Sequence, residues 1–214
     1  YGADAVRWFI LSDSPPDKDI QWSNQGVNAA YKFLQKIWNI NAEAKNRKNK
    51  TNSKDLEKKF KNEFQTYAAK ITNLIENFQL NVVIANFYEL YHLIKTYSEK
   101  EISNECLHSV LKDFMKMLIP FTPHLAHEVL ELIKEKQVNE WPKIDKGAIQ
   151  NQMLNMVIQI NGKTRDVIKI KRDLPEDKVV EESKKSNKVD SILSKKKIKK
   201  IIFVQNRIVN FLID

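Results

Sequence analysis

Residues 155–170, NMVIQINGKTRDVIKI, decide the fold class of this chain, because the spacing of its apolar residues changes there. Met156, Ile158 and Ile160 alternate with the residues between them, and this period of two is typical of a β-strand. Asn161-Gly162 is the strongest short signal for a hairpin turn, and the alternation resumes from Thr164 to Ile170. The stretch therefore predicts two strands joined by a type I′ turn.

Upstream of this hairpin the apolar residues follow a helical period. Between Val27 and Asn41 they recur every three or four residues, which predicts one buried helix face that includes Tyr31 and Trp38. Similar patterns run over 2–11, 55–77, 80–100 and 107–118, and Pro123 suits the first turn of a further helix. These segments predict an up-and-down bundle of about five helices. Trp8, Trp22 and Trp38 are expected as core anchors, and the non-periodic stretch 45–54 as a mobile loop.

Downstream of the hairpin the pattern predicts two helices and a second hairpin. The helices are expected from Pro175 to about Lys185 and over 187–193. The strands are expected over 198–204 and 208–213, around a turn at 205–207. The fold class is therefore mostly α, with a helical bundle followed by a small α+β domain of order ββααββ. Such a module of about 60 residues is marginal by itself and is expected to lean on the bundle or on RNA.

Positive charge is concentrated in this last part. The chain has 36 Lys and Arg against 27 Asp and Glu, a net charge of +9. Residues 1–150 contain 21 of the basic and 19 of the acidic residues, whereas 151–214 contain 15 and 8. This asymmetry favours a polyanion partner, nucleic acid first. A Lys-rich solvated surface and, for 195–200, a nuclear-import patch are the alternatives.

The candidate RNA-binding residues lie in two groups along the sequence. One flanks the first predicted hairpin, and the other precedes and enters the second, with one residue at its turn. Such groups bind phosphates without reading bases. The residues are Lys163, Arg165, Lys169, Lys171 and Arg172, and then Lys195, Lys196, Lys197, Lys199, Lys200 and Arg207.

Other motifs favour structural roles. Gly162-Lys163-Thr164 ends like a phosphate-binding P-loop, but Val157 stands where that motif requires Gly. His124 and His127 are spaced to chelate a metal, yet the zincin order is absent, and a helix start in which His124 bonds nearby backbone is favoured. Cys106, the single cysteine, is expected to be a small buried hydrophobe. No catalytic residue, metal ligand or cofactor site is predicted, and no apolar run reaches the ~18 residues of a membrane span.

Several stretches resemble class I aminoacyl-tRNA synthetases. Residues 1–9 and 14–23 resemble the segment that follows the KMSKS loop, and 120–128 resembles the last bundle helix of the leucyl, isoleucyl and valyl enzymes. Residues 157–165, together with 207–210, look like the C-terminal domain of bacterial-type leucyl-tRNA synthetases. Asp166 and Gln205 depart from that pattern.

The resemblance implies a class Ia anticodon-binding-type bundle and sets the expected organisation. Residues 1–23 would leave the catalytic domain, 24–150 would form the tRNA-binding bundle, and 151–214 the C-terminal tRNA-binding domain. The chain would be the C-terminal part of a longer, cytoplasmic, monomeric enzyme. Its partners would be tRNA(Leu) and the upstream catalytic and editing domains of the same polypeptide.

The complete enzyme would use ATP and Mg, whereas this part alone would be inactive. Two alternatives stay open: the bundle of an isoleucyl or valyl enzyme, and a free-standing RNA-binding module without enzymatic activity.

Overall fold

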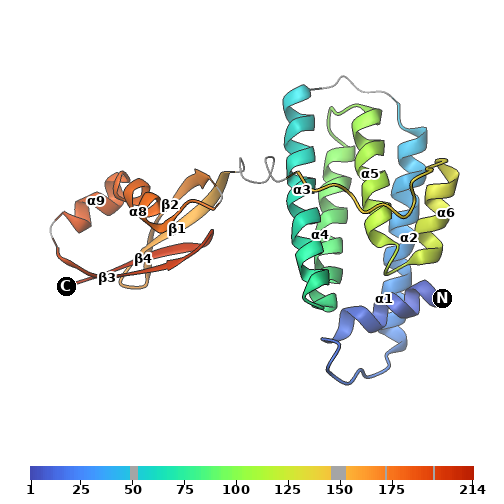
Figure 1. Cartoon of the computed structure of the whole chain (residues 1–214), viewed down its shortest axis with the longest axis horizontal. Helices are drawn as coiled ribbons and strands as arrows, with labels where there is room; N and C mark the ends of the chain where they lie inside the picture. Colours follow the sequence, from blue (N-terminus) through green and yellow to red (C-terminus); the bar gives the residue numbers. More distant parts are fainter. Residues whose placement is uncertain (49–52, 146–152, 172, 195) are drawn as a thin grey trace. The chain divides into compact units, whose positions relative to one another are not determined.

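A computed structural model describes residues 1–48, 53–145, 153–171, 173–194 and 196–214. Contacts within the chain divide it into two compact units, Tyr1–Ile144 and Asp145–Asp214. The first contains helices only and the second a sheet with helices (Figure 1). Each has a hydrophobic core of its own.

The first unit is a bundle of helices with one further helix across one end (Figure 1). The helix across the end is α1, and the helices of the bundle are α2 to α6. Their bounds are Ala3–Asp13, Asn24–Asn46, Lys54–Glu76, Leu80–Ser98, Asn104–Leu118 and Pro123–Leu132. The predicted bundle is confirmed, and the predicted boundaries lie within a few residues of the observed ones.

Serine side chains begin three of these helices. The hydroxyl oxygens of Ser23, Ser53 and Ser103 accept hydrogen bonds from the backbone N–H groups of Gly26, Leu56 and Cys106. Each bond satisfies one of the N–H groups that a helix leaves without an internal partner at its N-terminus. The chain therefore marks these helix starts by local chemistry, before any packing.

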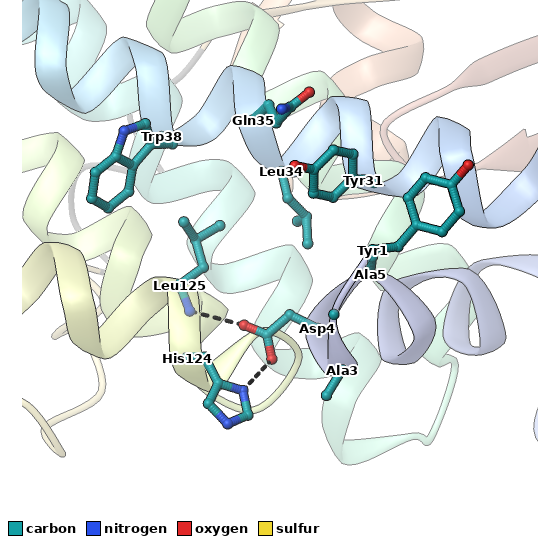
Figure 2. A pocket seen from close by; sticks show the side chains of 11 residues that line it. Tyr1, Ala3, Asp4, Ala5, Tyr31, Leu34, Gln35, Trp38, His124 and Leu125 are labelled. Atoms are coloured by element: carbon teal, nitrogen blue, oxygen red, sulfur yellow. Dashed lines mark hydrogen bonds and ion pairs between the residues drawn. The ribbon is translucent and has the colours of Figure 1, made fainter.

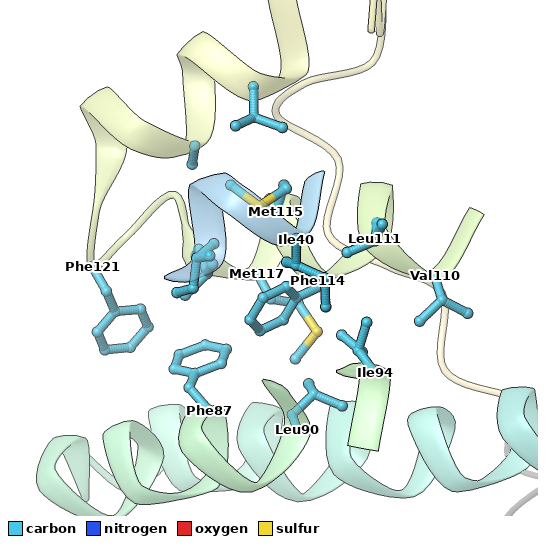
Figure 3. Close-up of a cluster of buried hydrophobic side chains, with 14 of the residues drawn as sticks. Ile40, Phe87, Leu90, Ile94, Val110, Leu111, Phe114, Met115, Met117 and Phe121 are labelled. Carbon is cyan, nitrogen blue, oxygen red and sulfur yellow. The ribbon is translucent and has the colours of Figure 1, made fainter. Parts of the chain in front are cut away.

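Aromatic rings fill the centre of the bundle. Phe87 packs edge-on against Phe114 and Phe121, with ring centroids 6.1 and 5.3 Å apart (Figure 3). Trp8 of α1 is fully buried, as predicted, and lies 5.3 Å from the ring of Phe33. Because α1 contributes Trp8 to the same core, it is part of the bundle unit.

Two of the expected core tryptophans are not in the core. The exposed fraction is 58% for Trp22 and 39% for Trp38, and Tyr31 is 37% exposed. The buried face of α2 instead runs through Phe33, Ile37 and Ile40. Tyr31 and Trp38 lie beside that face. The helical period predicted for α2 is therefore confirmed, but the buried face is narrower than predicted.

The loop expected over 45–54 is shorter than predicted, because the first two residues and the last residue of this stretch are helical. Its mobility stays a prediction. Helix α2 continues to Asn46, and α3 begins at Lys54. The guanidinium of Arg47 donates to the backbone carbonyl oxygens of Ser98, Ile102 and Lys100 at 2.8 to 3.1 Å. Arg47 therefore fastens the end of α2 to the segment between α4 and α5. Residues 49–52 lie outside the described part.

The second unit has the predicted order ββααββ. The strands are β1 (Met153–Ile160), β2 (Lys163–Lys171), β3 (Ile198–Val204) and β4 (Ile208–Ile213), and the helices are α8 (Glu176–Lys184) and α9 (Asn187–Leu193). The strand order in the sheet is β2-β1-β4-β3. Both hairpins are antiparallel, and β1 pairs in parallel with β4.

The turn between β1 and β2 has the predicted conformation. Asn161 and Gly162 have φ values of 49° and 76°, as a type I′ turn requires. The Asn161 side chain also bonds both backbone groups of Ile213, at 2.9 and 3.2 Å. One residue thus makes the first turn and holds the end of β4.

Both helices of this unit lie on one side of the sheet (Figure 1). Val179 of α8 and Val189 of α9 are fully buried against alternate residues of the strands, such as Met156 and Phe211. Among the described residues of this unit, no helix lies on the opposite side of the sheet. No helix among the described residues combines the length and the apolar character that crossing a membrane requires.

Candidate nucleic-acid interface

The side of the sheet that faces away from α8 and α9 is called the open face here. Successive residues of a strand point to opposite sides. The residues that alternate with the buried ones therefore belong to this face. They are Asn155, Val157 and Gln159 of β1, Val167, Lys169 and Lys171 of β2, Lys200, Ile202 and Val204 of β3, and Ile208, Asn210 and Leu212 of β4.

The open face combines an apolar middle with positive charge. Val167, Ile202 and Val204 are 49%, 40% and 44% exposed, and they belong to neither hydrophobic core. Lys169, Lys171 and Lys200 supply the charge, and no residue of the face as defined is acidic. A phosphate backbone that approaches this face would meet three lysines and no carboxylate among the residues that define the face.

The sheet topology groups the basic residues differently from their order in the sequence. Because β1 and β4 are parallel neighbours, the β1–β2 turn lies at the same end of the sheet as the last residues of β4. Gly162 N–H donates to Asn210 Oδ1 at 3.1 Å, and Asp214 N–H donates to the carbonyl of Lys197 at 3.3 Å. The basic residues of the first turn and of the start of β3 therefore lie at one end of the sheet, which we call the Lys163 end. It contains Lys163, Arg165, Lys196, Lys197, Lys199 and Lys200.

The other end of the sheet, the Arg207 end, contains Lys169, Lys171 and Arg207. Asn206, in the β3–β4 turn, exchanges two hydrogen bonds with Asp173, at 2.6 and 2.8 Å. This exchange brings the turn with Arg207 to the segment that follows Lys171. Each end therefore draws on both hairpins. Arg172 and Lys195, also candidates from the sequence, lie outside the described residues.

Two acidic groups change the electrostatics of this unit. Asp214 forms an ion pair with Lys199, so this lysine is partly neutralised. Asp166, the departure from the leucyl pattern, belongs to the helix side of the sheet, where Ser186 Oγ donates to it at 2.5 Å. That hydrogen bond is the main reason why the pKa of Asp166 is lowered. Asp166 therefore fastens the junction of α8 and α9 and leaves the open face basic.

The other motifs have structural roles here. Gly162-Lys163-Thr164 lies in the β1–β2 hairpin, where the Gly162 N–H already has the Asn210 acceptor. Cys106 is buried as expected, and burial raises the pKa of its thiol. Among the described residues no group of His, Cys, Asp and Glu has an arrangement that could hold a metal ion.

The expected partner of His124 was wrong. Its Nδ1 contacts Asp4 Oδ1 at 2.9 Å, so it bonds a carboxylate of α1 and not nearby backbone. The same carboxylate accepts the Leu125 N–H at 2.8 Å, and Thr122 gives α6 no side-chain cap. Asp4 thus caps α6 from 121 residues away in the sequence. No local signal could have predicted this contact.

A helical bundle and a small α+β unit with a basic open sheet face are features that favour the class of polyanion-binding proteins. Residues 57–181 match the family described as the anticodon-binding domain of tRNA ligase. This match covers more than half of the residues of the chain, and the chain therefore belongs to that family.

Curated relatives match the whole chain. It is 35% identical to a leucine–tRNA ligase of Prochlorococcus marinus (strain AS9601) and 32% identical to one of Petrotoga mobilis, in both cases over 100% of its length. A leucine–tRNA ligase of Zymomonas mobilis is 33% identical over 98% of the chain. The chain spans about a quarter of these relatives, namely 25%, 28% and 24% of their lengths.

A solved structure has the same fold. It is the ternary complex of Agrobacterium radiobacter K84 agnB2 LeuRS with tRNA and LeuAMS. The TM-score is 0.77 at 24% identity, over 99% of this chain and 28% of the other.

Proposed function

We propose that this chain is the C-terminal tRNA-docking portion of a leucine–tRNA ligase. It would position tRNA(Leu) for the ATP-dependent leucylation that the rest of the enzyme carries out. The observation that carries the proposal is the open face, with cations at both ends and no acidic residue among those that define it. The whole-length similarity to leucine–tRNA ligases supports it.

The contribution of such a portion to the reaction is positional. Contacts made far from the reacting atoms supply binding energy that orients the acceptor end of the tRNA in the active site. We assign residues 24–150 to the inner side of the L-shaped tRNA and 151–214 to its outer corner. Residues 1–23 would lead out of the catalytic domain, with which this chain would share a monomeric, cytoplasmic polypeptide. ATP and Mg would be bound outside this chain.

Salt dependence tests the docking role directly. The isolated chain should bind tRNA weakly, because phosphate contacts release counterions and give little base recognition. For about 4–6 such contacts the log–log slope of affinity against salt should be about −3 to −5. Fluorescence anisotropy with labelled tRNA measures it. An affinity that does not change with salt would contradict the proposal.

Charge reversal at the two ends tests which residues dock the RNA. Lys169→Glu with Lys171→Glu reverses two of the three cations of the Arg207 end, and Lys196→Glu with Lys197→Glu reverses two of the six cations of the Lys163 end. In the intact ligase either pair should lower aminoacylation at least about tenfold, whereas leucine-dependent ATP–pyrophosphate exchange stays near normal.

Lys178→Glu with Lys184→Glu is the matched control. It makes the same change in net charge on α8, on the helix side of the sheet. It should leave aminoacylation within about twofold of the parent, because only the long-range field changes. Equal loss of both reactions in the end variants would mean that the sheet unit supports the catalytic fold instead.

A further inference from the structure

An apolar pocket opens on the bundle unit. It has a volume of about 390 Å³ and is bounded by α1, α2 and the start of α6 (Figure 2). Its lining is mostly apolar or aromatic. The residues that matter below are Tyr1, Asp4, Tyr31, Trp38, His124 and Leu125.

Two aromatic side chains of α2 border this pocket in a half-exposed state. Tyr31 and Trp38 are seven residues apart, so they lie on the same side of the helix, two turns from each other. They are 37% and 39% exposed, although this helix buries Phe33 and Ile37 nearly completely. Large rings at the edge of an apolar hollow are typical of a surface that another macromolecule covers.

The pocket is preformed. The carboxylate of Asp4, only 10% exposed, accepts hydrogen bonds from the Leu125 N–H and from His124 (Figure 2). It also pairs with Arg7 at 2.9 Å. These contacts hold α1 against the first turn of α6. The two walls that face α2 are therefore fixed before anything binds, which lowers the entropy cost of binding.

The charge of the lining favours a protein over RNA as the occupant. None of the eleven residues that line the pocket is Lys or Arg, and one of them is the Asp4 carboxylate. Nucleic-acid sites place cations beside aromatic rings, because each stacked base brings a phosphate with it. Here a phosphate would find no Lys or Arg among the lining residues, whereas apolar side chains of a protein need none.

We propose that this pocket is the docking site for apolar side chains of the catalytic portion of the same ligase. The inference rests on the proposed function, and the length of the relatives supports it, since this chain spans only 25% of the Prochlorococcus enzyme. Covering Tyr31 and Trp38 would lock α1 and α2 onto the catalytic portion. A tRNA held by the sheet unit would then be held relative to the active site.

Hydroxyl-radical footprinting with mass spectrometry tests the proposal. The reactivity of Tyr31 and Trp38 is measured in the isolated chain and in the intact ligase, with and without tRNA, relative to an added reference peptide. Buried Trp8 is the internal control and should stay unreactive in every sample. In the intact ligase without tRNA both rings should lose at least about fivefold in reactivity, as residues at the core of an interface do.

Each other outcome overturns the proposal in a recognisable way. Protection only after tRNA is added would identify RNA as the occupant. Protection that grows with the concentration of the isolated chain would identify a second copy, and unchanged reactivity would leave the pocket uncovered. The docking role of the sheet is measured separately by the salt dependence of tRNA binding. Either hypothesis can therefore fail while the other holds.

Discussion

At the scale of single residues, Gly26 shows how close packing constrains the first turn of α2. A Cβ at this position would lie 2.5 Å from Cε2 and 2.8 Å from Cδ2 of Phe9. The Phe9 ring is itself 4% exposed and packs edge-on against Trp22, with ring centroids 5.7 Å apart. The ring therefore has little room to move, and Gly26 permits the close approach of α1 to α2.

Gly26→Ala should for this reason destabilise the bundle. In most helices the exchange of Gly for Ala gains about 0.5–1 kcal/mol. Overpacking against Phe9 should outweigh this gain, so that the free energy of unfolding of the variant falls by about 1–2 kcal/mol. Denaturant unfolding measures the difference.

Asn39→Ala, at an exposed position of the same helix, is the control and should be neutral or slightly stabilising. Adding Phe9→Leu to Gly26→Ala should make the cost of the pair less than the sum of the single variants, because the leucine leaves room for the new methyl group. Full additivity would rule out the steric explanation.

At the scale of elements, the helices are tied to one another by polar contacts at their ends. The Ser103 N–H, at the start of α5, donates to Glu57 Oε1 of α3 at 2.7 Å. Hydrogen bonds from the Ser103 hydroxyl and from this N–H lower the pKa of Glu57 below its ordinary value of 4.5. The ionised carboxylate thus joins α3 to α5, as Arg47 joins the end of α2 to the segment between α4 and α5.

The lowered pKa predicts how stability depends on pH. The ionised form of Glu57 stabilises the fold above the ordinary pKa, and this contribution is lost as the pH falls through the lowered value. Near pH 7 Glu57→Gln should lower the free energy of unfolding by about 1 kcal/mol. This is a low value for a charged hydrogen bond, because solvent screens the contact between Glu57 and Ser103. The difference from the parent should shrink toward about pH 3.

Unfolding in urea at several pH values measures this. Glu105→Gln, an exposed carboxylate in the first turn of α5, is a comparison that keeps the Glu57–Ser103 contact. A loss for Glu57→Gln that did not change between neutral and acidic pH would contradict the assignment.

At the scale of the whole molecule, the chain has two separate cores. Phe114 is fully buried in the helical core, and Phe211 is fully buried between the sheet and its helices. Because the two clusters share no residue, we expect the units to lose stability separately. This independence would suit the proposed roles, in which the sheet unit docks RNA and the bundle unit both faces the tRNA and is attached to the catalytic portion.

Phe114→Ala and Phe211→Ala test this independence. Each should destabilise its own unit by about 3–5 kcal/mol, the usual cost of removing a buried ring. Hydrogen exchange with mass spectrometry should show faster exchange in α2 to α5 for the first variant and in β1 to β4 for the second. Faster exchange in both units from either variant would mean that the cores are coupled.

The sequence by itself determined the elements. Ser23 and Ser103, the Asn161-Gly162 turn and the two periods of apolar residues act within a few residues of chain. The bundle and the ββααββ order could therefore be predicted, and the bounds 187–193, 198–204 and 208–213 agree with the structure. The basic candidates could be found in the same way, because charge is a property of each residue.

Only the tertiary structure decided what those elements bring together. The parallel pairing of β1 with β4, which aligns Val157 with Ile208, placed basic residues from both sequence groups at each end of the sheet. One face of the sheet remained open. Asp4 came to cap α6, and Tyr31 and Trp38 came to border a pocket instead of entering the core. The physical reason is that these outcomes depend on contacts between residues far apart in the chain. The local sequence around a hydrophobic or charged residue does not specify which distant residue will contact it.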